Sequence, residues 1–197
     1  MWRETITPDD VRGRARVDSL AQRDPELALK AAKAIKHPWY RCQSLSAVAC
    51  HIEGNRKLVI LKEAVEVAKQ QTEINRIVTV SAWPMRQLAK VSPDFAKAEI
   101  SWLVDLANSE PHTLRRADAL FVLAQSVSGF PSQLNLIIPS LVRALLNGHG
   151  WRIDRLIRES IDLVEAVQPE ALPLLVEQHS EGAKKRQLSL RVGENQI

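Results

Sequence analysis

The sequence predicts an all-α protein built as an α-solenoid, a superhelix of about five antiparallel helix pairs. Pro93, Pro131 and Pro169 follow one another at intervals of 38 residues, and each of them begins an amphipathic segment. A fixed interval of this length is typical of arrays of stacked supersecondary units. The 197 residues include only seven glycines and show no sustained alternation of apolar and polar residues, so nothing in the pattern favours strands.

The helix boundaries follow from capping residues and prolines. Thr7 before Pro8 and Asp24 before Pro25 are typical of helix N-termini. The internal prolines Pro84 and Pro139 are expected to kink or split their helices. The predicted first helices of the pairs cover residues 8–23, 39–52, 73–91, 111–128 and 151–167, and the second helices cover 25–36, 55–70, 93–108, 131–147 and 169–181.

A second pattern recurs on the first helices, where an arginine is followed four residues later by leucine or valine. The arginines are Arg41, Arg76, Arg116 and Arg152, at intervals of 35, 40 and 36 residues. An arginine at a fixed place in a repeat either pairs with an acid of the neighbouring hairpin or forms part of a binding surface. We favour the first interpretation, in which the arginines form a structural ladder.

The helix-start proline, the arginine and a core of the type Leu-x-x-Val-Ala resemble the HEAT-like family of α-solenoid repeats. The core occurs as residues 45–49 and, with Leu in place of Val, as residues 120–124, and the resemblance covers roughly residues 8–181. It implies a binding scaffold that holds a partner on its concave face, with the second helices lining that face. We therefore expect one solenoid domain over residues 1–182, and a polar, frayed or disordered tail over 183–197.

The charge of the chain is modest and uneven. The net charge is +4, and residues 1–100 carry a net charge of +5. This excess is weak for a nucleic-acid-binding protein, which usually shows clustered basic residues. No segment offers the roughly 20 apolar residues that span a membrane, and Met1 is not followed by an apolar signal-peptide core. The expectation is a cytoplasmic protein that does not contact a membrane.

The sequence contains few residues in patterns typical of catalytic or metal-binding sites. The five histidines are scattered, and the sequence contains neither a Gly-x-Ser-x-Gly element nor a glycine-rich phosphate loop. Cys42 and Cys50 lie eight residues apart on one predicted helix. Their separation of roughly 12 Å is too large for a disulfide, so both are expected to be reduced and to pack in the core. We expect no metal, no cofactor and no enzymatic activity.

Tryptophan supplies five of the nine aromatic residues. Trp83 and Trp102 lie among apolar neighbours and are expected in the core. Trp39 and Trp151 stand at helix starts beside arginines, where partial exposure is expected. Trp with Arg is enriched at interface hot spots, but we favour a local packing role at the helix start for each of the two. The candidate partner-binding residues are Trp39, Arg41, Arg76, Arg115, Arg116, Trp151, Arg152 and Arg155.

The favoured function is a non-catalytic protein–protein interaction module. Two alternatives remain open: a nucleic-acid-binding protein and an inhibitor or immunity-type protein that blocks one partner. For the first, residues 114–117 and the spacing of Trp102 and Asp105 resemble the HEAT-like DNA glycosylases that act on alkylated bases. In that family a Trp-Asp-Trp-Arg group holds the damaged nucleotide, and Trp102, Asp105 and Arg115 would be the matching residues. The chain lacks the denser Trp-Trp-Asp cluster of that family.

Overall fold

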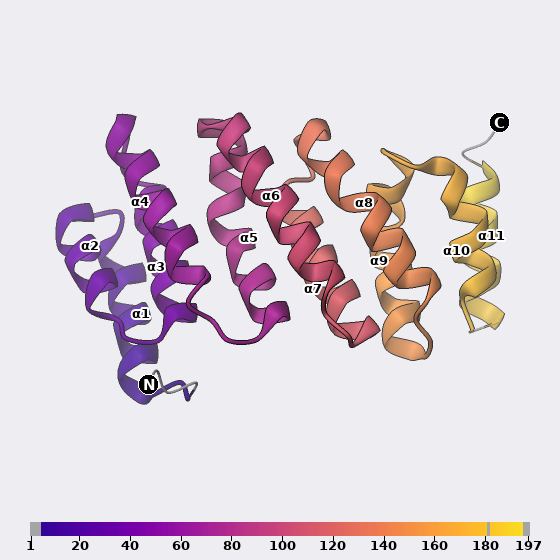
Figure 1. Ribbon diagram of the computed structural model, residues 1–197, viewed down its shortest axis with the longest axis horizontal. Coiled ribbons are helices and arrows are strands. Elements are labelled where there is room, and N and C mark those ends of the chain that lie inside the picture. Colours follow the sequence, from indigo (N-terminus) through magenta and orange to yellow (C-terminus); the bar gives the residue numbers. More distant parts are fainter. Residues whose placement is uncertain (1–4, 181, 195–197) are drawn as a thin grey trace. The chain divides into compact units, whose positions relative to one another are not determined.

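The computed structural model describes residues 5–180 and 182–194, and all regular secondary structure within these ranges is helical. The chain divides into two compact units, Met1–Ala98 and Glu99–Ile197, and the boundary falls inside helix α6 (Figure 1). The predicted all-α fold class is therefore confirmed for the described ranges.

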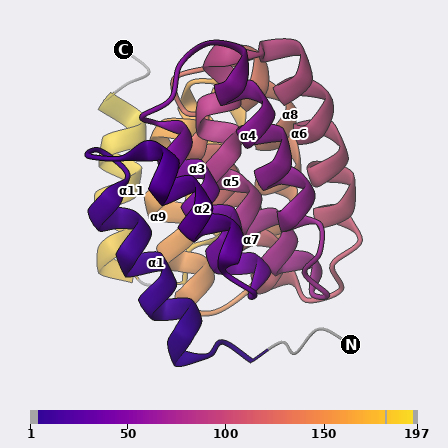
Figure 2. The same ribbon diagram turned by 90° about the vertical axis from the view of Figure 1, so that its left-hand side faces the viewer.

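The first unit is a succession of helical hairpins. Helix α1 packs against α2, α3 packs against α4, and α4 packs against α5, while α3 contacts both α1 and α5. In Figure 2 the first hairpin, α1 and α2, faces the viewer with α3 behind it. The helices are α1 (Pro8–Leu20), α2 (Pro25–Ala34), α3 (Pro38–Ala49), α4 (Gly54–Ala68), α5 (Ile74–Val91) and the beginning of α6 (Pro93–Asn108).

The second unit repeats this arrangement. Helix α7 packs against α8 and α9, and α8 also contacts α9 and α10. The side chain of Asn108 on α6 donates a hydrogen bond of 3.1 Å to the Ser140 hydroxyl on α8. The elements are α7 (Thr113–Ser126), α8 (Pro131–Leu146), α9 (Trp151–Glu165), the 3₁₀ turn η1 (Pro169–Ala171), α10 (Leu172–Gln178) and α11 (Gly182–Glu194).

The predicted helix-start signals act as caps. The Thr7 hydroxyl accepts from the backbone N–H of Asp10, and the Asp24 carboxylate accepts from that of Leu27. These contacts satisfy N–H groups that have no partner inside the helix. Helices α5 and α8 each continue through their internal proline, Pro84 and Pro139, so neither proline splits its helix.

The apolar positions of the arginine pattern belong to the core. Leu45, Val80, Leu120 and Leu156 are all buried. Each of them lies on the side of its helix that packs against neighbouring helices. The helical spacing of apolar residues in the sequence therefore predicts the core-facing side of these helices correctly.

The C-terminal segment differs from its prediction. The sequence predicts a frayed or disordered tail over 183–197, whereas the structure has helix α11 there, and residues 195–197 lie outside the described residues. Leu188 and Val192, four residues apart, are buried, and α11 packs on α10. This apolar pair is enough to hold a helix whose other residues are largely polar. The single domain over 1–182 stays a prediction.

Candidate functional site

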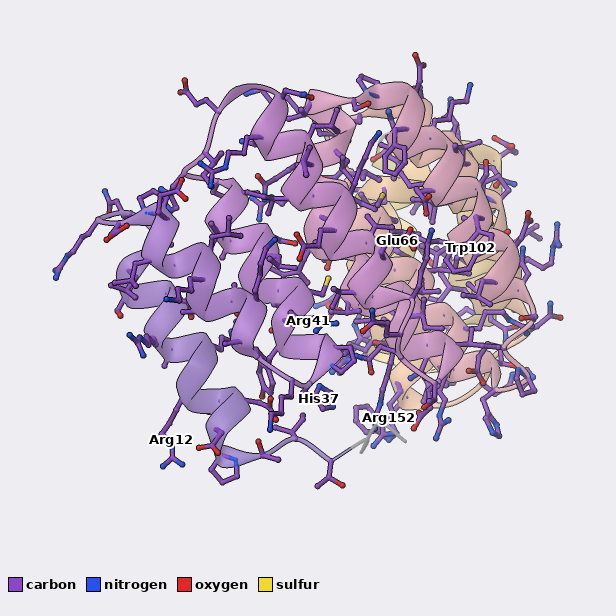
Figure 3. All side chains as sticks on the ribbon, turned by 60° about the vertical axis from the view of Figure 1, so that its left-hand side comes forward. Arg12, His37, Arg41, Glu66, Trp102 and Arg152 are labelled. Carbon is purple, nitrogen blue, oxygen red and sulfur yellow. The ribbon has the colours of Figure 1, made fainter. Side chains whose placement is uncertain are left out.

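Two of the repeated arginines contact residues in the segment between α4 and α5. Arg41 Nη2 donates a hydrogen bond of 2.6 Å to Gln70 Oε1, and Arg76 Nη2 lies 3.5 Å from Glu73 Oε1. One partner is an amide and the other is the acid that precedes the arginine on its own helix. Figure 3 labels Arg41 and His37 at the beginning of α3.

The other two arginines contact still different groups. Arg116 Nη1 donates to the backbone carbonyl of Glu110 at 3.3 Å, and the Arg152 guanidinium carbon lies 5.2 Å from the centre of the Trp151 ring. The favoured ladder of arginines paired with acids of neighbouring hairpins does not describe these four contacts. Arg76, Arg116 and Arg152 instead contact groups at the start of their own helices, whereas Arg41 contacts Gln70 after the end of α4. Arg115, beside Arg116, is exposed.

The beginning of α9 holds three of the candidate residues. The Trp151 side chain is 63% exposed and lies against Arg152. Arg155 Nε lies 3.7 Å from Glu159 Oε1, and both side chains are about half exposed to solvent. An exposed ion pair of this kind contributes little stability. The beginning of α9 therefore carries an exposed indole, one arginine against that indole, and a second arginine whose charge is partly neutralised by Glu159.

Two tryptophan predictions are wrong. Trp83 is 43% exposed and Trp102 is 41% exposed, although both were expected in the core. Helix α5 contacts both α3 and α4, so most of its surface is covered, and Trp83 falls on the strip that remains open. Trp39 is half-buried, and its backbone N–H donates to His37 Nδ1 at 3.2 Å.

An aromatic cluster escapes prediction from the sequence. The guanidinium carbon of Arg14 on α1 lies 5.6 Å from the centre of the Tyr40 ring on α3 and 5.5 Å from that of the Trp83 ring on α5. Arg14 Nη1 also donates a 2.5 Å hydrogen bond to Gln43 Oε1. Such distances are typical of cation–π contacts. The residues of the cluster come from three different helices, so no short sequence motif could have predicted it.

Buried carboxylates tie the first helix of a hairpin to the segment after its second helix. Asp10 Oδ1 accepts from the backbone N–H groups of His37 and Lys36 at 2.9 and 3.2 Å. In the second unit, Asp154 Oδ1 accepts from the Ser180 N–H at 3.3 Å, and Asp154 Oδ2 accepts from the Ser180 hydroxyl. Both aspartates are buried with their bonds satisfied, which indicates a structural role.

The two cysteines have different surroundings. Cys42 is fully buried, and burial raises the pKa of its thiol. Cys50 is exposed, so the prediction that it packs in the core is wrong. It follows the last residue of α3 and borders an open hollow of about 590 Å³ that Lys57 and Val91 also line.

Within residues 5–180 and 182–194, no group of three or more His, Cys, Asp or Glu side chains is arranged to hold a metal ion. None of the helices in the same ranges combines the length and apolar character needed to cross a bilayer. The residues that match the glycosylase pattern, Trp102 and Asp105 on α6 and Arg115 on α7, are all exposed.

Comparisons with protein-family models, with curated proteins and with solved structures find no match for this chain. The resemblance to HEAT-like repeats therefore depends on the residues that carry it.

Proposed function

We propose that the chain is a HEAT-like α-solenoid of about five helix pairs that acts as a non-catalytic, cytoplasmic protein–protein interaction module. The packing within each unit supports the architecture, because α3 contacts both α1 and α5, and α7 contacts both α8 and α9. Hairpins that bury their apolar stripes against the next hairpin form a continuous core and leave broad surfaces for partners.

The observation that carries this proposal is the exposure of three tryptophans. Trp83, Trp102 and Trp151 are 43%, 41% and 63% exposed. A large aromatic side chain that remains in contact with water loses stabilisation that it would gain on burial, and Trp dominates interface hot spots. Three such residues on one chain are better explained by contacts with a partner than by folding.

The second helices are the proposed partner-facing set. Helices α2, α4, α6 and α10 each carry one exposed large apolar side chain, namely Leu27, Val59, Trp102 and Leu174. In the HEAT-like family the second helices line the inner face, so these side chains would point toward a bound protein or peptide. Among them, Trp102 offers the largest surface to bury.

Affinity capture from the host tests the proposal. The full chain and its Trp102→Ala variant are each immobilised, and bound proteins are quantified by mass spectrometry, with Val91→Ala as a matched control for loss of an exposed apolar side chain. We expect the full chain and the control to retain the same partner, and Trp102→Ala to lose most of it. A single stoichiometric partner indicates an inhibitor, and several partners indicate a scaffold. Equal capture by all three proteins would contradict the proposal.

A nucleic-acid function is the second candidate, and the exposure of Trp102, Asp105 and Arg115 favours it. Binding of duplex and single-stranded DNA is measured in a salt series, since phosphate contacts make affinity fall steeply as salt rises. Release of an alkylated base would extend this candidate to the glycosylase activity. Absence of DNA binding at low salt removes the candidate.

A further inference from the structure

The helices of the first unit differ in how their charges are paired. Ion pairs link the second helices, because Arg56 on α4 binds Glu26 on α2, and Lys33 Nζ on α2 lies 2.9 Å from Glu63 Oε2 on α4. The first helices α3 and α5 contain four basic residues and no Asp or Glu. Two ion pairs therefore compensate four of the charges on α2 and α4, whereas α3 and α5 contain no acidic residue of their own.

The open strip of α5 concentrates the free charge. Trp83, Arg86 and Lys90 follow one another at intervals of three and four residues, so they share one side of the helix. Arg86 and Lys90 are exposed, and neither side chain makes a hydrogen bond or an ion pair with any residue that the structure describes. Two free cations thus lie within two helical turns of an exposed indole.

The indole is held in place from the neighbouring helices. Arg14 lies against both Trp83 and Tyr40, and its hydrogen bond to Gln43 fixes the guanidinium between α1 and α5. Asp18 Oδ2 lies 3.8 Å from Arg14 Nε and compensates part of its charge. A side chain that is already ordered loses little entropy on binding, so Trp83 is suited to act as an anchor.

We propose that this Trp83 face, formed by Trp83, Arg86 and Lys90 with Arg14 and Tyr40 behind them, binds an acidic segment of a partner protein. An apolar side chain of the segment packs on the indole, and its carboxylates pair with Arg86 and Lys90. The proposal rests on the proposed function in taking a protein as the partner, and it adds a surface on the first helices to that of the second helices.

The charge of the first unit favours an acidic protein segment as the ligand of the Trp83 face. The first unit contains 17 Lys and Arg against 11 Asp and Glu, whereas the second contains 10 against 12, so the surplus of positive charge belongs to the first unit. Affinity for nucleic acid grows with the number of phosphates that Lys and Arg neutralise, and a protein with strongly salt-dependent binding makes about 6–10 such contacts. The two free cations of the Trp83 face match a pair of carboxylates better than a phosphate backbone.

Fluorescence anisotropy with defined probes tests the inference. The probe is a fluorescein-labelled 12-residue peptide of Glu, Asp and Leu, compared with the same peptide carrying Gln and Asn in place of the acids. A single-stranded oligonucleotide of equal net charge is the third probe. We expect the full chain to bind the acidic peptide at low salt, at least tenfold more tightly than either other probe.

Variants locate the binding to this face. The double variant Arg86→Gln/Lys90→Gln should weaken peptide binding at least tenfold, and Trp83→Ala should weaken it about fivefold. The control Lys30→Gln/Lys97→Gln removes two exposed cations from α2 and α6, with the same change in net charge, and should leave affinity within twofold. Circular dichroism of each variant verifies that it is folded.

Three results would overturn the inference: no binding of the acidic peptide, equal loss in the control variant, or tighter binding of the oligonucleotide. Host capture distinguishes this failure from that of the proposed function. If Trp102→Ala loses the captured partner while Arg86→Gln/Lys90→Gln retains it and the peptide does not bind, only the inference about the Trp83 face fails.

Discussion

The carboxylate of Asp10 on α1 accepts a hydrogen bond of 2.9 Å from the backbone N–H of His37, the residue that precedes α3. The same carboxylate accepts from Thr7, the cap of its own helix. One buried side chain therefore fixes the start of the first hairpin and the beginning of the second. Loss of this hydrogen-bond acceptor should therefore destabilise both the first and the second hairpin.

Replacing Asp10 by Asn should lower the free energy of unfolding by about 1–3 kcal/mol, because charge-assisted bonds to buried N–H groups are lost or weakened. The measurement is urea denaturation followed by circular dichroism. The matched control is Asp9→Asn, whose exposed carboxylate bonds only to Arg12 among the described contacts, and it should cost at most about 1 kcal/mol.

The effect of Asp10 should depend on pH. Burial acts to raise the pKa of Asp10, but the hydrogen bonds from Thr7, His37 and Lys36 outweigh it and hold the pKa below its ordinary value. The stabilisation is complete above the unfolded pKa of about 3.9 and is lost as pH falls through the folded pKa. The difference in free energy of unfolding between the unsubstituted protein and Asp10→Asn should therefore become smaller below about pH 4. A difference that stays constant down to the acid transition would show that the charge of Asp10 contributes nothing.

Gly148 should not tolerate a methyl group. A Cβ at this position would lie 2.6 Å from Cδ1 and 2.8 Å from Cγ1 of Ile153, and 3.3 Å from the carbonyl oxygen of Ala144. We expect Gly148→Ala to lower the free energy of unfolding by about 1–3 kcal/mol. Gly129→Ala is the control, because nothing lies within 4 Å of its Cβ, and it should change stability by less than about 1 kcal/mol. Equal effects of the two substitutions in thermal denaturation would contradict this packing.

Leu120 occupies the apolar position of the arginine pattern on α7 and is fully buried. Its replacement by alanine should cost about 2–5 kcal/mol, since the cavity left behind adds to the lost burial. Val59→Ala on α4, where the side chain is exposed, is the control and should cost less than about 0.5 kcal/mol. Urea denaturation of both variants measures the difference, and a small cost at Leu120 would show that the pattern does not mark the core.

The two thiols should react at different rates. Cys50 is exposed, whereas Cys42 is fully buried and its raised pKa disfavours the thiolate. Treatment of the folded protein with iodoacetamide should label one thiol, and peptide mass spectrometry should place the label on Cys50. Unfolding in guanidinium should make both react. Labelling of Cys42 in the folded protein at the rate of Cys50 would contradict the burial of α3.

Local chemistry explains which parts of the fold the sequence reveals. Thr7 and Asp24 accept hydrogen bonds from backbone N–H groups within three residues, so their capping role follows from the local sequence. Pro131 and Pro169 begin helical segments because their fixed φ suits the first turn and their missing N–H is not needed there. The exposure of Trp83 depends on the rotation of α5 about its own axis where it packs against α3 and α4. Because the neighbours of Trp83 in the sequence are apolar, the periodicity does not determine this rotation. Helix α11 was missed because its two buried residues are too few to produce a periodic signal.

The candidate site was harder to predict for a related reason. The partners of Arg41 and Arg116 are a side chain at the end of another helix and a backbone carbonyl in a turn. Neither is recognisable as an arginine partner from residue type. The contact between Arg14 and Trp83 joins residues 69 positions apart, and only the packing of α1, α3 and α5 brings them together.

We propose that successive hairpins stack into an elongated solenoid, and small-angle X-ray scattering of the protein tests this proposal most directly. A compact globule of 197 residues has a radius of gyration of about 16 Å. For a stacked solenoid we expect a clearly larger radius of gyration and a pair-distance distribution with a long tail at large distances. A radius at the compact value with a symmetric distribution would contradict it.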